Sequence, residues 1–317
     1  MTPQDDLPPL EVLPRDISAY AKGNTGIPYV HRFESGRPGP HVLVNALTHG
    51  NEICGMVAAT HLLDTGVRPQ LGTLTISFAH VEAYNAFDAK APHENRQLVH
   101  NLNRVWSDEW LDGPEDSPEL RRARELRPVV AAADHILDIH STSQPVDPFW
   151  VYPAFARNAE VALTIGRPSI HLVMPKGLGS GTPLIQHGRH GDEAGTAGAA
   201  LVVECGQHFL QSAADLATQV ALDFVAHFGL IERDPADRPA PVPQRRFELL
   251  QTRMIKTPEF RFVRPLVGFE TFAEGELIAT DGNEEVRAPC DECTVLMPAR
   301  LPIVGREGVY LARPIPT

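Results

Sequence analysis

Short apolar runs alternate with segments of helical periodicity over the first two thirds of the chain. Four runs, rich in leucine and β-branched residues, are expected to form buried strands: 41–47, 71–78, 136–140 and 199–203. Three segments with apolar residues three or four positions apart are expected to form helices: 51–64, 119–133 and 212–228. Pro128 is expected to kink or break the second of these helices. The alternation predicts an α/β fold, with a mostly parallel (mixed) sheet that carries helices on both faces.

The pattern changes after a proline-rich segment at residues 232–246, whose composition is typical of a linker. Beyond it, short strand-like runs interrupted by glycine and proline replace the helical spacing. We therefore predict two domains, an α/β domain over residues 1–240 and a small all-β barrel or sandwich over residues 241–317. The second domain is expected to shield the active site or to form the contact of a homo-oligomer.

Composition and charge restrict the class of protein further. The 317 residues are 43% hydrophobic and 21% charged, which excludes disorder as the main state. The net charge of −12 argues against nucleic acid and anionic membranes as partners, because both attract clustered Lys and Arg, and leaves a small-molecule partner. The sequence has no apolar stretch long enough to span a membrane, and its acidic, proline-rich N-terminus lacks signal-peptide features, which predicts a cytoplasmic location.

Several catalytic motifs are absent from the sequence: GxxxxGK[ST], GxSxG, HExxH and GxGxxG. Their absence argues against a P-loop or Rossmann nucleotide site and against an α/β-hydrolase triad. Cys290 and Cys293 form a CxxC pair without a second pair of ligands. We interpret them as small apolar side chains near a turn rather than as a metal site.

Polar residues stand where the predicted strands end. His49 and Glu52 lie at a strand-to-helix corner, from which an imidazole nitrogen and a carboxylate can reach the same divalent metal. Taken alone, Glu52 has a simpler explanation, because an acidic side chain near the N-terminus of a helix stabilises that helix electrostatically. His140 ends the run 136–140, and Asp138 shares its face, where it can hold the outer nitrogen of a metal-bound histidine.

Glu204 follows the apolar run 199–203 and, taken alone, is a solvated carboxylate at a strand end. All of these residues, however, fall at the carboxyl ends of strands, where open α/β sheets build their active sites. Two histidines and one glutamate leave an open position on zinc, and a further glutamate nearby can act as a general base.

The segment from Arg96 to Arg104 is a candidate anion site. Guanidinium groups bind carboxylates in bidentate fashion, and Asn103 adds a neutral donor. The alternative is a solvated loop in which Arg104 pairs with a surface acid.

The motifs HGNE (49–52), NLNR (101–104) preceded by Arg96, DIHST (138–142) and VVECG (202–206) together resemble the succinylglutamate desuccinylase/aspartoacylase family of zinc carboxypeptidase-like amidohydrolases. The resemblance covers roughly residues 40–230 and implies a zinc-carboxypeptidase-like catalytic domain, to which the small β domain is also suited. It implies one zinc ion per chain, and the residues implied to hold that ion are His49, Glu52 and His140.

The resemblance also implies roles for the other candidates. Glu204 activates the zinc-bound water and then protonates the leaving amine, while Arg96 stabilises the oxyanion of the tetrahedral intermediate. Asn103 and Arg104 bind the free carboxylate of the substrate. Together these roles predict a zinc-dependent deacylase that cleaves the amide bond of a small N-acyl amino acid or related N-acyl compound.

The sequence departs from the family pattern at several positions. Asn101 stands where an aspartate is common, an exchange that we expect to leave the metal core unaffected. Ala194 stands where aspartoacylase-like members place an arginine for a second acidic group, and Arg189 is out of register. The resemblance therefore does not predict N-acetylaspartate or succinylglutamate as the substrate. For His187 and His190 we favour a solvated, mobile loop over a pocket lining.

Two other functions fit part of these observations. A metallocarboxypeptidase acting on short peptides needs the same zinc site and a carboxylate-binding arginine, so the core motifs alone do not separate it from a deacylase. The short segments between Glu52 and His140 and after Glu204 favour the smaller substrate. A non-catalytic binding protein is disfavoured, because a degenerate member is expected to lose at least one of the metal ligands or Glu204.

Overall fold

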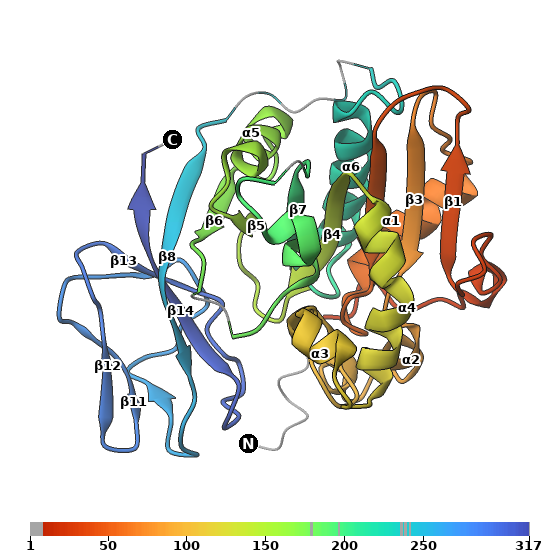
Figure 1. The fold of residues 1–317 in the computed structure, drawn as a ribbon. Helices are drawn as coiled ribbons and strands as arrows, with labels where there is room; N and C mark the ends of the chain where they lie inside the picture. Colours follow the sequence, from red (N-terminus) through yellow and green to blue (C-terminus); the bar gives the residue numbers. More distant parts are fainter. Residues whose placement is uncertain are drawn as a thin grey trace.

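A computed structural model of the chain describes residues 9–177, 180–195, 197–234, 237, 240 and 242–316. Helices flank a long mixed sheet, and a small antiparallel sheet lies toward one end of the molecule (Figure 1). Within the described ranges, none of the helices has the length and apolar character needed to cross a membrane.

The main sheet has eleven strands of mixed direction. Their spatial order is β1 (Val30–Glu34), β3 (Thr73–Phe78), β2 (His41–Ala46), β4 (His135–Thr142), β7 (Ala200–Gln207), β5 (Phe149–Pro153), β6 (Ile170–Met174), β8 (Arg245–Met254), β14 (Glu307–Ile315), β13 (Cys293–Leu296) and β10 (Thr271–Phe272). Strands β3, β2, β4 and β7 are parallel, and β5, β6 and β8 form a second parallel group that meets β7 in antiparallel pairing. The mixed, mostly parallel core that the sequence predicts is confirmed.

Helices cover both faces of this sheet. They are α1 (Ile53–Asp64), α2 (Val81–Asn85), α3 (Asp108–Asp112), α4 (Pro118–Ala132), α5 (Ala156–Ile165) and α6 (Gln211–His227). Successive strand residues point to opposite faces, so each central strand contributes to two cores. Val42 and Val44 pack in the core that holds apolar residues of α1, α5 and α6, while Leu43 and Ile136 pack in the core that holds those of α4. The predicted layers are therefore present.

The direction of the connections reverses around β2. The chain leaves β2 through α1 to reach β3 on one side, and it reaches β4 on the other side after α4. In open α/β sheets, ligands bind outside the carboxyl ends of the strands at such a switch point. The carboxyl ends of β2 and β4 are therefore where a site is expected.

The C-terminal segment is all-β, as predicted, and part of it extends the main sheet. β8 pairs with β6, and β14, β13 and β10 follow it in antiparallel order. A separate small sheet holds β12 (Glu284–Arg287), β11 (Leu277–Asp281) and β9 (Arg261–Phe262). The predicted linker lies partly outside the described residues, and β8 begins within it at Arg245. A domain boundary at residue 240 stays a prediction.

Two features differ from the sequence-based expectations. Helix α4 continues through Pro128 to Ala132, so the predicted break is absent. Leu126 and Val130 are buried on either side of the proline, and their packing outweighs the loss of one backbone hydrogen bond. Strands β5 and β6 and helix α5 lie between two predicted strands and were not among the elements predicted from the sequence.

Candidate metal centre

Three buried side chains converge at the carboxyl ends of β2 and β4. His49 and Glu52 lie in the turn between β2 and α1, and His140 lies in β4. One potential ligand atom from each residue lies within 4.8 Å of the others. Glu52 stands at the N-cap position of α1, but its side chain makes no capping hydrogen bond. Its carboxylate therefore belongs to the His–Glu–His group and not to the helix end.

Gly50 allows this turn to pack tightly. Its N–H donates to the carbonyl oxygen of Arg96 at 3.0 Å. A Cβ at residue 50 would lie 2.4 Å from the carbonyl oxygen of Asn95 and 2.5 Å from the carbonyl carbon of Ala83. Only glycine fits against these backbone atoms, and the glycine between the two candidate ligands therefore has a steric cause.

His140 is oriented through its outer nitrogen. Its Nε2 lies 2.8 Å from Oδ2 of Asp138, which is on the same face of β4. Asn45 and Thr48 donate to the other oxygen of Asp138 at 2.8 and 2.7 Å. A carboxylate fixed in this way and bonded to the outer nitrogen is the usual partner of a metal-bound histidine.

His49 is oriented by a neutral group. Its Nε2 lies 2.9 Å from Oδ1 of Asn101, which also accepts the backbone N–H of Asn103. We expected that asparagine in place of aspartate at residue 101 would leave the metal core unaffected, but Asn101 contacts the candidate ligand His49 directly. The local sequence does not show this contact, because it joins residues that are far apart along the chain.

The carboxylate of Glu52 lies between the two histidines. Its Oε1 is 2.8 Å from Nδ1 of His49, and its Oε2 is 2.9 Å from Nδ1 of His140. With the protons on the outer nitrogens, each Nδ1 directs a lone pair toward a carboxylate oxygen. Oε2 is buried and makes no aligned hydrogen bond to any described residue. Lone pairs that point at one another repel unless a cation lies between them. The two Nδ1 atoms and the Glu52 carboxylate therefore suit a divalent metal such as zinc.

Without a cation, the three groups share protons unequally. Burial and the nearby Arg96 guanidinium lower the pKa of His49 to about 4. Burial also lowers the pKa of His140, but Asp138 and Glu52 outweigh it and hold this pKa well above its ordinary value. Burial raises the pKa of Glu52, but His49 and His140 outweigh it and hold this pKa well below its ordinary value. A metal ion held at this site would therefore displace a proton from His140.

Glu204 faces the candidate ligands from the next strand. Its Cα is the register partner of His140 in the β4–β7 ladder, so both side chains lie on the same face of the sheet. Burial, reinforced by the neighbouring Glu52 and Asp138 carboxylates, raises the pKa of Glu204 to about 8, although His140 and Arg96 oppose the rise. Its Oε2 is buried and has no hydrogen-bond partner among the described residues. The carboxylate is therefore free to exchange a proton with a group bound beside it.

Arg96 approaches the same group from a loop. It ends the short 3₁₀ helix Glu94–Arg96, and its Nη1 donates to Oε1 of Glu52 at 3.0 Å. About a third of its side chain is exposed, 34%, so the guanidinium reaches from the buried carboxylate to the surface. The predicted cation is thus next to the candidate metal ligands.

Arg104 contacts the C-terminal strand β14. Its guanidinium lies 2.9 Å from Oε1 of Glu307 and 3.1 Å from the hydroxyl of Tyr310, and its Nε donates to Ser180 at 2.9 Å. Asn103 accepts the backbone N–H of Leu184 through Oδ1 at 3.0 Å. The sequence alone did not indicate Glu307 or Tyr310, because no motif surrounds them.

Two histidines in the described part of the segment before Glu204 are less exposed than we expected. His187 and His190 are buried, so the predicted solvated loop is wrong for both of them. His187 Nδ1 lies 2.8 Å from the carbonyl oxygen of Trp106. Arg189 points toward the end of α4, where it donates to the carbonyl oxygen of Ala133 at 2.5 Å. Arg189 therefore does not replace the missing arginine at position 194.

A further buried pair lies behind the metal ligands. Nδ1 of His208 is 2.8 Å from the hydroxyl of Ser141, the residue after His140. Burial lowers the pKa of His208 to about 3, with Arg96 and His93 adding to this effect and Glu52 opposing it. His208 is therefore neutral in the folded protein at neutral pH.

The buried state of His208 predicts a loss of stability in mild acid. The unfolded chain binds a proton at this residue near pH 6.5, whereas the folded chain does so only near pH 3, so stability falls as the pH drops from 6.5 toward 3. At pH 5, the unequal protonation of His208 is expected to lower the free energy of unfolding by about 2 kcal/mol. Urea titrations give the free energy of unfolding of wild type and His208→Gln at pH 8 and pH 5. At pH 8 the two proteins differ only by the lost packing of the imidazole, so the change in this difference at pH 5 measures the effect of protonation. An equal pH dependence in both proteins would contradict this assignment.

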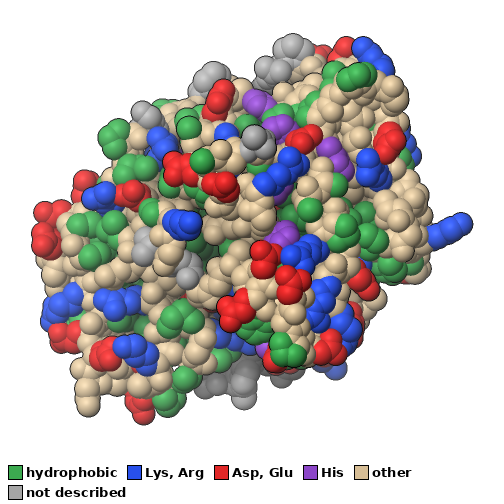
Figure 2. All heavy atoms as spheres, viewed as in Figure 1, with side chains coloured by type: hydrophobic (Ala, Val, Ile, Leu, Met, Phe, Trp, Pro, Cys, Tyr) green, Lys and Arg blue, Asp and Glu red, His purple; other side chains and the backbone are tan. Residues whose placement is uncertain are grey.

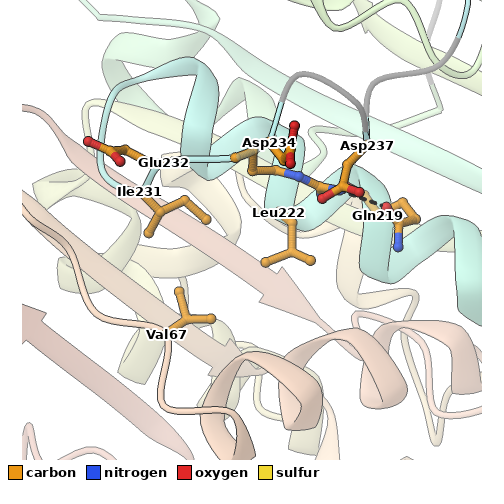
Figure 3. Close-up of a pocket in the computed structure, with 8 residues that line it drawn as sticks. Val67, Gln219, Leu222, Ile231, Glu232, Asp234 and Asp237 are labelled. Atoms are coloured by element: carbon orange, nitrogen blue, oxygen red, sulfur yellow. Dashed lines mark hydrogen bonds and ion pairs between the residues drawn. The ribbon is translucent and has the colours of Figure 1, made fainter.

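Other surface features lie apart from these residues. In Figure 2, acidic and basic side chains are interspersed over the face shown, so the net negative charge is not concentrated there. Figure 3 shows a cavity of about 490 Å³ between the end of α6 and the turn after α1, lined by Val67, Gln219, Leu222, Ile231, Glu232, Arg233, Asp234 and Asp237. None of the candidate site residues lines this cavity.

Together, the fold and the site define an α/β protein with a buried His–Glu–His ligand group at the switch point of its sheet. Residues 38–160 match the model of the succinylglutamate desuccinylase/aspartoacylase catalytic domain. This range contains His49, Glu52, Arg96 and His140 and ends before Glu204. Over these residues the chain is similar to the catalytic domain of the succinylglutamate desuccinylase/aspartoacylase family.

Two relatives of known name are similar to this chain in sequence. Succinylglutamate desuccinylase of Vibrio vulnificus is 24% identical over 321 residues, which cover 95% of this chain and 83% of that protein. Human N-acyl-aromatic-L-amino acid amidohydrolase (carboxylate-forming) is 33% identical over 111 residues, which are 32% of this chain and 33% of the human protein. The alignment with the human protein thus spans only a third of its length.

Solved structures show the same fold. Succinylglutamate desuccinylase from Vibrio cholerae superposes with a TM-score of 0.69 at 17% identity, covering 90% of this chain and 85% of that one. The ectoine utilization protein EutE (DoeB) from Ruegeria pomeroyi, solved with bound product, superposes with a TM-score of 0.62 at 16% identity, covering 90% and 88%. The predicted α/β architecture with C-terminal β-structure is thereby confirmed at the level of fold.

Proposed function

We propose that the protein is a zinc-dependent hydrolase that cleaves the amide bond of a small N-acyl amino acid. The observation that carries this proposal is the convergence of His49, Glu52 and His140 with the unpartnered carboxylate of Glu204 beside them. Deacylases and amidohydrolases among the named relatives support the reaction class.

His49, Glu52 and His140 would hold the metal, each histidine through its Nδ1 and Glu52 through its carboxylate. When bound there, a zinc ion supplies a Lewis acid and lowers the pKa of water. Asp138 and Asn101 hold the outer nitrogens of the two histidines, and this fixes the tautomer that leaves Nδ1 free. One ion per chain is expected, because the part of the chain that the structure describes holds one such ligand group.

Glu204 and Arg96 carry out the proton transfer and the charge stabilisation. The carboxylate of Glu204 takes a proton from the attacking water and delivers it to the nitrogen of the leaving amine. Arg96, already 3.0 Å from Glu52, lies on the edge of the ligand group, where its guanidinium can stabilise the oxyanion.

Asn103 and Arg104 bind the carboxylate of the substrate in this proposal. The guanidinium of Arg104 is already held by Glu307, Ser180 and Tyr310. These contacts fix its orientation, which reduces the entropy lost on binding a carboxylate.

The substrate class follows from the side chains before Glu204. Ala194 offers no cation, and Arg189 is turned toward Ala133 and Asp134. A substrate with a second acidic group would find no arginine from this segment. We therefore propose N-acyl derivatives of amino acids with neutral side chains as substrates.

A panel of amides tests this proposal with the zinc-loaded protein. We expect N-acetyl derivatives of neutral amino acids to be hydrolysed with a kcat/KM about tenfold or more above that of N-acetylaspartate, since an unpaired buried carboxylate costs 1.4 kcal/mol or more. Dipeptides with free amino groups serve as controls for a carboxypeptidase. Preferred hydrolysis of the dipeptides, or no hydrolysis of any acylated amino acid, would contradict the proposal. Cytoplasmic location and homo-oligomer formation stay predictions.

A further inference from the structure

A buried carboxylate fastens the loop that carries Arg96. Glu119, in the first turn of α4, has no exposed surface. Its Oε1 accepts the backbone N–H groups of Leu98 and Val99 at 2.7 and 3.0 Å and lies 2.9 Å from Nε2 of His80. Burial raises the pKa of Glu119, but the hydrogen bond from His80 and those from the two N–H groups outweigh it and hold this pKa well below its ordinary value. The side chain is therefore charged at neutral pH, and charged acceptors form the stronger hydrogen bonds.

The other side of the loop is fixed beside the candidate metal ligands. The carbonyl oxygen of Arg96 accepts the N–H of Gly50 at 3.0 Å, and Nδ2 of Asn95 donates to the carbonyl oxygen of Ala83 at 3.1 Å. With its backbone held on both sides, Arg96 directs its guanidinium to Oε1 of Glu52.

Helix α4 is itself docked on the sheet at this point. Ser117 caps its N-terminus by accepting the N–H of Leu120 at 3.1 Å. Arg122 donates to the carbonyl oxygens of Ala79 and Phe78, just where β3 ends, at 2.8 and 2.9 Å. Glu119 thus connects the loop to an element that the sheet holds in place.

We propose that Glu119 is a positioning residue, which holds residues 97–100 so that Arg96 stays over the Glu52 edge of the ligand group. The proposal rests on the proposed function, in which Arg96 stabilises the oxyanion. A shift of about 1 Å in such a group is sufficient to cost a large part of the rate. A purely structural role for Glu119 would lower stability without acting through Arg96.

The first experiment does not depend on activity. Amide hydrogen exchange of Leu98 and Val99 is measured in wild type, Glu119→Gln and Glu119→Ala. We expect exchange about tenfold or more faster in Glu119→Ala and an intermediate rate in Glu119→Gln, whose amide oxygen is a weaker acceptor. Glu125→Ala, on the same helix but paired with Arg122 at the surface, serves as the matched control. Unchanged exchange in both Glu119 variants would overturn the proposal.

The second experiment is a double-mutant cycle on hydrolysis. We expect Glu119→Ala to lower kcat by about 10- to 100-fold with KM changed less than about threefold, and Glu119→Gln to restore part of kcat. In an Arg96→Ala background the same replacement is expected to change kcat by less than about twofold, because the residue through which it acts is gone. Metal content is expected to be equal in all variants.

The outcomes separate the two proposals. If Glu119→Ala lowers kcat equally in the presence and absence of Arg96, the positioning role is overturned, while the proposed hydrolase function is left intact. A wild-type protein that hydrolyses none of the amides would overturn the proposed function, and the exchange rates would then decide on Glu119 alone. If Glu119→Ala fails to fold, amide exchange and the double-mutant cycle are both measured with Glu119→Gln. This variant keeps an acceptor for the buried N–H groups.

Discussion

Replacing Glu204 by glutamine is expected to lower kcat by about 10³-fold while the protein keeps its fold and its metal. Loss of a positioned general acid–base group has effects of this size. Glutamine keeps the shape of the side chain but can neither accept the proton of the attacking water nor return it to the leaving amine. The carboxylate is suited to this exchange, because burial raises its pKa to about 8 and its Oε2 has no partner among the described residues.

Two measurements make this expectation specific. Metal analysis of Glu204→Gln is expected to match wild type, because Glu204 is not one of the three converging ligands. Glu160→Gln, at an exposed position of α5, is the matched control and is expected to leave kcat unchanged. A Glu204→Gln enzyme as active as wild type would contradict the assigned role, and one that lacks metal would make Glu204 a ligand instead.

Replacing His140 by alanine is expected to remove both the metal and the activity. The remaining His49 and Glu52 provide only two protein ligands, and Asp138 loses the imidazole that it holds. We expect the bound metal to fall from about one ion per chain to near zero, and kcat to fall by about 10³-fold or more. Metal analysis by mass spectrometry and the amide assay measure the two effects.

Chelation provides an independent test of the same ligand group. Wild type treated with a chelator is expected to lose activity and to regain it on addition of zinc, whereas His140→Ala is expected to gain nothing from added zinc. His61→Ala, an exposed histidine in α1, controls for loss of a histidine at the surface. Full activity in chelator-treated wild type would contradict a metal-dependent reaction.

The sequence predicted the central sheet and the ligand group for the same physical reason. The runs that form β2, β4 and β7 are apolar on both faces, because helices cover both sides of the sheet. Against such runs, the polar residues His49, His140 and Glu204 stand out. Since parallel strands end at the same edge, residues far apart in sequence were expected to meet there, and the structure brings His49 and His140 to the same Glu52 carboxylate.

The residues that hold these groups could not be predicted in the same way. Asn101 bonds to His49, and Glu119 to the loop after Arg96, through pairs that no local pattern connects. Glu307 meets Arg104 only because β14 joins the main sheet through β8, a pairing that the proline-rich segment before it did not suggest. Contacts of this kind depend on the register of distant strands, and a single sequence does not specify that register.

The continuity of the main sheet into β14 has a consequence for biosynthesis. The three candidate ligands lie in the turn between β2 and α1 and in β4, so they leave the ribosome before the C-terminal strands of the sheet. The partners of Arg104, Glu307 and Tyr310, are made well after these ligands. Because chains fold from the N-terminus as they emerge, we expect a nascent chain to assemble the metal centre before it completes the surroundings of Arg104. In the proposed function, selective hydrolysis would then begin only after β14 has joined the sheet.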